Sequence, residues 1–432
     1  MGRHVVVPSV PLVAMENLPL TFLSVPREGE RTADKLCHKV NLIALRQLLT
    51  MGGGLPGRAS ESLRKIQFVL QQMVRETPKP VLEVISSPDI QIPLLVMAAG
   101  LRSPELLIPR IVPNVLAGLR HHRGLIPEAL LWDHSVDEIV FAGEGRLCWQ
   151  PPLKALLLDP AGLAVENERG ERKNITSMSD AEDFNGASKG GLHVIGSPDL
   201  GLHLGLFDTN PLAMDEAHPD KSGNRISLGN HSIEDWQQSL SDALNLIQIA
   251  LPTWYEELAC TTQRILPVGY EPEMHLSASY REAPGIVYMT LHPDPLTMAE
   301  ALIHETQHGK LNLLSWLDPV LHNAYSDWCE SPVRPDLRPV MGVLLAVHAF
   351  VPVAALHHQL AVIDHPISRT RKFQDRRLQV LEGNAGGLAV VRDTADPSAF
   401  GKKLIDGLHA CHEFVSRDYN LSGVGQQAMP PG

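Results

Sequence analysis

The sequence predicts a mixed α+β protein in which helices predominate. Apolar residues recur at helical spacing in the first 130 residues and again from about residue 231 to the C-terminus, whereas short β-rich segments lie between them. A chain of 432 residues is also too long for one small core. We therefore predict a helical N-terminal region (1–130), a β-rich region with long loops (131–230) and a helical domain (231–432).

Helical spacing dominates the first 130 residues. The segments 33–51 and 60–76 both have one apolar face, and the first is followed by the helix stop Gly52-Gly53-Gly54. The segment 104–122 continues the helical pattern with proline interruptions. The three glycines do not form a phosphate-binding loop, because no Gly-Lys-Ser/Thr follows them.

Strands are expected from about residue 134. Three short segments between 137 and 170 are rich in β-formers and are separated by Gly or Asp-Pro turns. The polar, glycine-rich stretch 174–191 is interpreted as an exposed loop or linker. Strand character returns in 191–208, and 210–224 is a long irregular loop of the kind that often lines a site.

The last region returns to helices. The segment 232–251 begins with a Ser-x-x-Asp capping pattern, and 284–291 is a strand. Asp294 and Pro295 are the expected N-cap and first residue of the next helix. A Pro-, Asp- and Trp-rich loop (318–339) leads to an apolar helix, and two further helices, about 370–392 and 398–416, are expected after it.

Composition narrows the range of partners and compartments. A net charge of −12 argues against nucleic acids and anionic membranes, which attract basic surfaces. The five cysteines include no C-x-x-C pair, which fits a reducing compartment. Residues 1–20 contain too many prolines and an early acid for a signal peptide, and the apolar stretch 340–356 falls short of the ~20 residues that a span needs. We expect a cytoplasmic protein.

One helix carries the pattern His-Glu-x-x-His. His304 and His308 are four residues apart, so their Cβ atoms lie roughly 5–6 Å apart on one helix face. Two imidazoles so placed can bind one divalent metal, and Glu305 then lies beside the open metal positions. Apolar residues flank the motif on both sides, which favours a metal site over a surface helix with two solvated histidines.

The third ligand is less certain from the sequence. His348 is the only polar side chain between Arg338 and His357, so the apolar helix that carries it is expected to pack against the motif helix; a core histidine satisfied by a hydrogen bond is the alternative. Glu330 has a suitable separation from the motif but lies in a loop. Three histidines would leave metal positions open for a chelating cosubstrate, which suits Fe(II) as well as zinc.

A longer stretch carries a family resemblance. The strings PGIVYMTLHPDPLTMAEALIHETQHGKLN and YSDWCESPVRPDLRPVMGVLLAVHAFV resemble the H-E-x-x-H proteins of gene clusters for ribosomally made, modified peptides. The resemblance covers about 280–360. It implies an Fe(II)- and 2-oxoglutarate-dependent hydroxylase that acts on the β-carbon of a side chain in a precursor peptide.

The same resemblance implies roles for single residues. His304, His308 and His348 correspond to the iron ligands, and Arg338 to the cation that holds the distal carboxylate of 2-oxoglutarate. A guanidinium suits that task because it binds a carboxylate through two hydrogen bonds. Arg334 is the rival in the same loop.

Two other functions remain open. A zinc metallopeptidase would use Glu305 as general base for a metal-bound water, but no helix with a suitable glutamate follows the motif. The extended metzincin pattern is excluded, because Leu311 and Leu314 stand where it needs Gly and His. A peptide-binding scaffold with a vestigial site is the third possibility.

Overall fold

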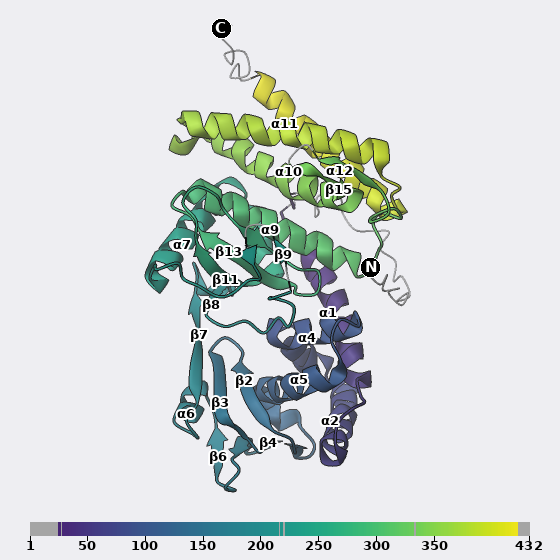
Figure 1. The fold of residues 1–432 in the computed structure, drawn as a ribbon, viewed down its shortest axis with the longest axis vertical. Helices are drawn as coiled ribbons and strands as arrows, with labels where there is room; N and C mark the ends of the chain where they lie inside the picture. The colour runs from purple at the N-terminus through teal and green to yellow at the C-terminus, as the bar shows by residue number, and fades with distance from the viewer. Residues whose placement is uncertain (1–24, 27, 216, 219–220, 332–333, 422–432) are drawn as a thin grey trace.

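The computed structural model describes residues 25–26, 28–215, 217–218, 221–331 and 334–421. The protein is mixed α/β, with 54% helix and 19% strand, so the predicted predominance of helices is confirmed. Figure 1 shows an elongated molecule, with the first helices at one end and the last helices at the other. The N-terminal segment 1–20, on which the signal-peptide argument rests, lies outside the described residues.

Prolines divide the N-terminal region into short helices. Pro78, Pro88 and Pro104 each begin a helix. Proline is tolerated there because the backbone N–H groups of the first turn form no hydrogen bond within the helix. Every residue from Pro88 to Met97 is buried, so this helix is the centre of the N-terminal core. The helices are α1 (Thr32–Thr50), α2 (Gly57–Glu76), α3 (Pro78–Ile85), α4 (Pro88–Ala98), α5 (Pro104–Leu119) and the 3₁₀ turn η2 (Arg120–Leu125).

Two sheets follow. A four-stranded antiparallel sheet has the order β1-β4-β5-β6, and a seven-stranded mixed sheet has the order β12-β13-β11-β8-β7-β3-β2. The two strands β9 and β10 form a separate pair, as do β14 and β15. The strands are β1 (Leu130–Trp132), β2 (Val136–Phe141), β3 (Gly145–Leu153), β4 (Ala155–Asp159), β5 (Gly162–Glu166), β6 (Arg172–Ile175), β7 (Ser188–Val194), β8 (His203–Gly205), β9 (Ala217–His218), β10 (Lys221–Ser222), β11 (Thr262–Tyr270), β12 (Ser277–Ala278), β13 (Gly285–Leu291), β14 (Trp328–Ser331) and β15 (Arg334–Pro339).

The large sheet continues across the predicted boundary at residue 230. Strand β11 pairs in parallel with β8 on one side and with β13 on the other. The β-rich region and the third region therefore share one sheet. The stretch 174–191 also differs from the expected loop, because it contains the short helix α6 (Met178–Glu182) and the start of β7, which pairs with β3.

The remaining helices pack around the end of this sheet and above it. In Figure 1, α9 lies beside the sheet. Helices α10, α11 and α12 lie together on the side of α9 that faces away from the strands. The bounds of α7, α9, α10, α11 and α12 agree with the predicted helices to within a few residues at most ends, whereas no helix was predicted where α8 lies. The helices are α7 (Ile233–Ala250), α8 (Pro252–Thr261), α9 (Pro295–Ser315), α10 (Val340–Val362), the 3₁₀ turn η4 (Pro366–Arg369), α11 (Arg371–Thr394) and α12 (Ala399–Leu421).

Local capping chemistry sets several of these ends as predicted. Ser232 and Asp235 form a reciprocal capping box at the start of α7. Asp294 caps α9 by accepting a hydrogen bond from the Leu296 amide at 3.0 Å, and Pro295 is the first helical residue. The loop 318–339 differs from expectation in its second half, which forms the hairpin β14–β15.

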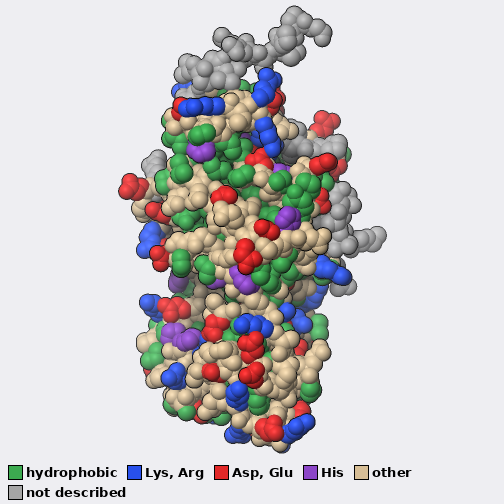
Figure 2. Space-filling view, turned by 90° about the vertical axis from the view of Figure 1, so that its left-hand side faces the viewer, with side chains coloured by type: hydrophobic (Ala, Val, Ile, Leu, Met, Phe, Trp, Pro, Cys, Tyr) green, Lys and Arg blue, Asp and Glu red, His purple; other side chains and the backbone are tan. Residues whose placement is uncertain are grey.

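Helix α10 is long and apolar enough to cross a membrane by length and composition. However, 78% of its most apolar window is buried inside the protein, as in a core helix. On the face drawn in Figure 2, acidic and basic side chains are interspersed rather than separated by sign.

Candidate metal centre

Buried polar contacts hold α9 against the neighbouring helix α8. Lys310 is completely buried and forms an ion pair with Glu257 of α8. Gln307 accepts a hydrogen bond from the Trp254 indole at 3.2 Å. These contacts hold α9 against α8, and Lys310 lies roughly 120–160° round the helix axis from the two motif histidines.

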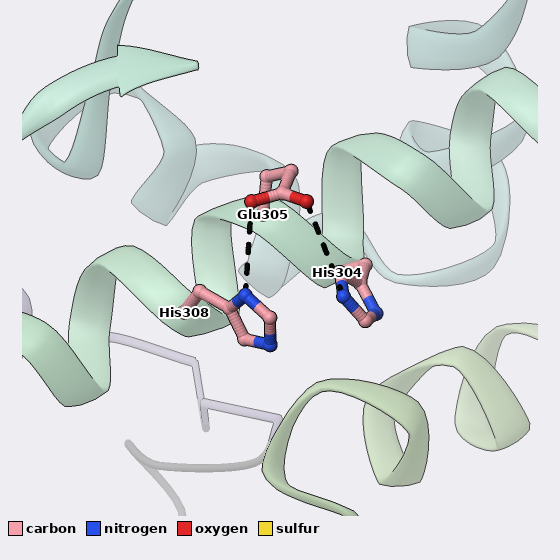
Figure 3. Close-up of side chains that lie close together, drawn as sticks. All are labelled: His304, Glu305 and His308. Atoms are coloured by element: carbon pink, nitrogen blue, oxygen red, sulfur yellow. Dashed lines mark ion pairs between the residues drawn. The ribbon is translucent and has the colours of Figure 1, made fainter. Parts of the chain in front are cut away.

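The motif side chains converge as the sequence predicts. One donor atom from each of His304, Glu305 and His308 lies within 4.8 Å of the other two. The two imidazole rings are tilted by 57° with centroids 4.3 Å apart. Figure 3 shows both rings on one side of α9, with one oxygen of the Glu305 carboxylate facing each ring. Such a cluster of two nitrogens and an oxygen suits a divalent cation.

Glu305 is an almost fully buried carboxylate with several polar neighbours. Its two oxygens lie 4.0 Å from the His304 Nε2 and 3.7 Å from the His308 Nδ1. The Ser277 hydroxyl of β12 donates a hydrogen bond to it at 2.6 Å. Burial by itself raises the pKa of Glu305, but His308, His304 and the Ser277 hydroxyl outweigh burial and lower it to about 2. The carboxylate is therefore charged at neutral pH.

His304 is neutral at the same pH. Burial, together with the nearby His308, lowers its pKa to about 3, although Glu305 acts in the opposite direction. A neutral imidazole is the form that binds metals, so no proton has to be displaced before His304 coordinates one. The Phe350 ring of α10 packs against the His304 ring at 4.8 Å and covers one of its edges.

One motif nitrogen is left without a hydrogen bond. The Nε2 atom of His308 is buried and has no hydrogen-bond partner among the described residues. A buried polar atom without a partner costs free energy, which a bound cation would remove. The donor set and this orphaned nitrogen both fit a metal ion at the motif.

The structure does not bring His348 to the pair. Among the described residues, the group of possible metal ligands comprises the three motif side chains and not His348. His348 is fully buried in α10, and its carbonyl accepts a hydrogen bond from the Gln307 amide at 3.5 Å. It is Phe350, about 200° further round α10, that meets His304. The rival ligand Glu330 lies exposed in β14 and is also outside the group.

The arginine that the resemblance implies is paired with a neighbouring acid. Arg338 is 39% exposed and forms an ion pair with Asp336 at 2.9 Å within β15. The side chain of Arg334 lies outside the described residues. The guanidinium whose charge acts on His304 is Arg376 of α11. It lies over the Phe350 ring and pairs with Glu300 at 2.7 Å.

The sequence did not identify His275 as a neighbour of the motif. Burial together with His292 lowers the pKa of His275 to about 4, although Glu305 acts in the opposite direction, and His275 is one of the groups that lower the pKa of His304. His275, His292, Asp294, Thr297 and Lys372 line a cavity of about 450 Å³.

Comparison with known proteins assigns no family to this chain. No family model matches the chain, and no curated protein matches it significantly.

Proposed function

We propose that this protein is a metal-dependent enzyme that hydroxylates a side chain of a ribosomally made peptide, with Fe(II) as cofactor and 2-oxoglutarate as cosubstrate. The observation that carries the metal-dependent part is the convergence of His304, His308 and the buried Glu305 carboxylate within 4.8 Å. The choice of oxygen chemistry is supported by the resemblance of residues 280–360.

The protein side chains have distinct tasks in this proposal. His304 and His308 hold the cation through neutral imidazoles, and Phe350 limits the movement of the His304 ring. Ser277 holds the Glu305 carboxylate next to the pair, where it can orient a bound molecule by accepting a hydrogen bond. The iron, when bound, would couple the oxidative decarboxylation of 2-oxoglutarate to insertion of an oxygen atom into a C–H bond of the peptide.

Two arginines compete for the distal carboxylate of the cosubstrate. The resemblance implies Arg338, which would have to leave Asp336 to bind it. Arg376 is the arginine whose charge reaches His304, but it is engaged with Glu300. Replacement of each arginine by Met decides between them. Replacement of the arginine that binds 2-oxoglutarate should raise the KM for that compound, whereas replacement of the other should leave it unchanged.

The decisive experiment supplies anaerobically purified protein with Fe(II), 2-oxoglutarate, O₂ and a ribosomally made precursor peptide. We expect succinate in proportion to peptide that has gained one oxygen atom, and neither product with a His304→Ala variant. Peptide fragments formed with zinc and without 2-oxoglutarate would instead establish a metallopeptidase with Glu305 as general base. Peptide binding that survives His304→Ala, with no chemistry from the unaltered protein, would establish a scaffold.

A further inference from the structure

We propose that Cys37 and Cys260 form a reversible disulfide bond when the protein meets a hydroperoxide, with Cys37 as the sulfur that reacts first. The two cysteines lie on α1 and α8, outside the metal centre, and the proposal does not depend on the function assigned to that centre. No motif in the sequence indicates this pair, because the two cysteines are 223 positions apart.

The first argument is the contact between the two residues. The Cys37 thiol donates a hydrogen bond to the backbone carbonyl of Cys260 at 3.3 Å, where α1 packs against α8. A hydrogen bond with the Cys37 thiol is also the largest cause that raises the pKa of the Cys260 thiol, so the two sulfurs are neighbours as well. Formation of an S–S bond therefore requires rotation of two side chains that are already in contact.

The second argument is access for a small oxidant. Cys37 and Cys260 are free thiols and both are partly exposed. The other cysteines, Cys148, Cys329 and Cys411, are partly exposed too, but they lie on the separate elements β3, β14 and α12. Exposure is thus common to all five cysteines, and it is the contact with a second thiol that distinguishes this pair.

The surroundings of Cys260 decide which sulfur reacts first. The hydrogen bond with Cys37, burial, and the negative charges of Asp34 and Glu257 raise the pKa of the Cys260 thiol. The thiolate is the nucleophile in thiol oxidation, so Cys260 is held in its unreactive form. Oxidation of Cys37 consumes the thiol that is the largest of these causes, and Cys260 then ionises more readily.

The chemistry balances in two steps. The Cys37 thiolate attacks the terminal oxygen of the hydroperoxide, the O–O bond breaks, and a sulfenic acid forms while the leaving alkoxide or hydroxide takes up the proton of the Cys37 thiol. The Cys260 sulfur then attacks the Cys37 sulfur, the S–O bond breaks, and the leaving hydroxide takes the Cys260 proton to form water. The two thiols lose two hydrogens and two electrons, which the hydroperoxide gains.

The disulfide would join the N-terminal helices to the helix that supports the metal motif. Helix α8 carries Glu257, whose side chain forms the buried ion pair with Lys310 of α9. A cross-link between positions 223 apart restricts the unfolded chain and so favours the folded one. Oxidation should therefore raise the urea concentration at which the protein unfolds.

The test counts free thiols in the unaltered full-length protein. Hydrogen peroxide is added together with a chelator, which keeps trace iron from producing radicals, and thiols are counted after denaturation. We expect five thiols before treatment, three after it because two are consumed, and five again after dithiothreitol, with a linked peptide that contains Cys37 and Cys260 in mass spectrometry. Retention of all five thiols, or loss of thiols without that linked peptide, would overturn the inference.

Single variants separate this pair from the other cysteines and test the order of reaction. Cys148→Ser is the matched control and should still form the linked peptide, whereas Cys37→Ser and Cys260→Ser should not. Dimedone should trap a sulfenic acid at Cys37 in Cys260→Ser, and should leave Cys260 unlabelled in Cys37→Ser. Label at Cys260 but not at Cys37 would overturn the order of reaction, and equal urea midpoints for the oxidised and reduced proteins would overturn the stabilisation.

Discussion

The buried ion pair behind the motif allows a quantitative test of how α9 is held. Lys310 is 0% exposed and Glu257 is 5% exposed in their side chains, and no other residue of α9 forms an ion pair with α8 among the described residues. Replacement of Lys310 by Met preserves much of the side-chain volume but leaves the Glu257 carboxylate buried without its cation. Burial already raises the pKa of Glu257 despite the attraction of Lys310, so the carboxylate is poorly solvated there.

The expected loss follows from that arrangement. Breaking a buried ion pair from one side costs about 3–5 kcal/mol in the free energy of unfolding, because the remaining charge is uncompensated. The double variant Lys310→Met/Glu257→Leu removes both charges and should recover most of this loss. The exposed pair Lys402–Asp406 of α12 is the control, since Lys402→Met should cost less than about 0.5 kcal/mol.

Urea denaturation followed by tryptophan fluorescence measures these differences, because Trp254 lies against Lys310 and reports on this contact. A decrease of less than about 1 kcal/mol in the free energy of unfolding for Lys310→Met would refute the reasoning, since a buried and uncompensated carboxylate should destabilise the fold by more than this. A double variant no more stable than the single one would refute it as well, because the penalty would then come from packing rather than charge.

Three further predictions concern the sheet and the motif. Burial raises the pKa of the Asp89 carboxyl, but the buried ion pair with Arg264 outweighs burial and holds this pKa below its ordinary value. The stabilisation by this ion pair is complete above about pH 4 and is lost as the pH falls toward the lowered pKa. Arg264→Met should therefore flatten the acid side of a curve of unfolding free energy against pH. Ser277→Ala should destabilise the fold by about 1.5–3 kcal/mol in chemical denaturation, because it removes a hydrogen bond to a buried charge. Glu305→Gln should retain bound metal in elemental analysis, since both motif imidazoles remain, while product formation falls by at least ~10-fold; a variant that keeps full turnover would contradict the role given to this carboxylate.

Local sequence signals were reliable where local chemistry decides the structure. The Asp294-Pro295 start of α9 and the Ser232–Asp235 capping box depend on residues three or fewer positions apart, and both were predictable. The mutual approach of His304 and His308 is also local, since four residues make about one helical turn.

Longer-range relations were not predictable in the same way. The sheet crosses the expected boundary at 230 because β11 pairs with β8, and such pairings have no signature in either strand alone. His348 looked like a ligand because it is the lone polar residue of an apolar helix. That property does not say which face of α10 meets α9, and it is Phe350 that contacts the motif.

The sequence by itself therefore determined most of the long helices, the caps of α7 and α9, and the pair of imidazoles on one helical turn. Tertiary structure decided which side chains contact the motif from other elements: the hydroxyl of Ser277 and the ring of Phe350 come from a strand and a helix whose positions are fixed only by packing. The physical reason is that helical spacing is set by the backbone hydrogen bonds of neighbouring residues. The side chains that face a helix, in contrast, are chosen by burial of apolar surface over the whole core.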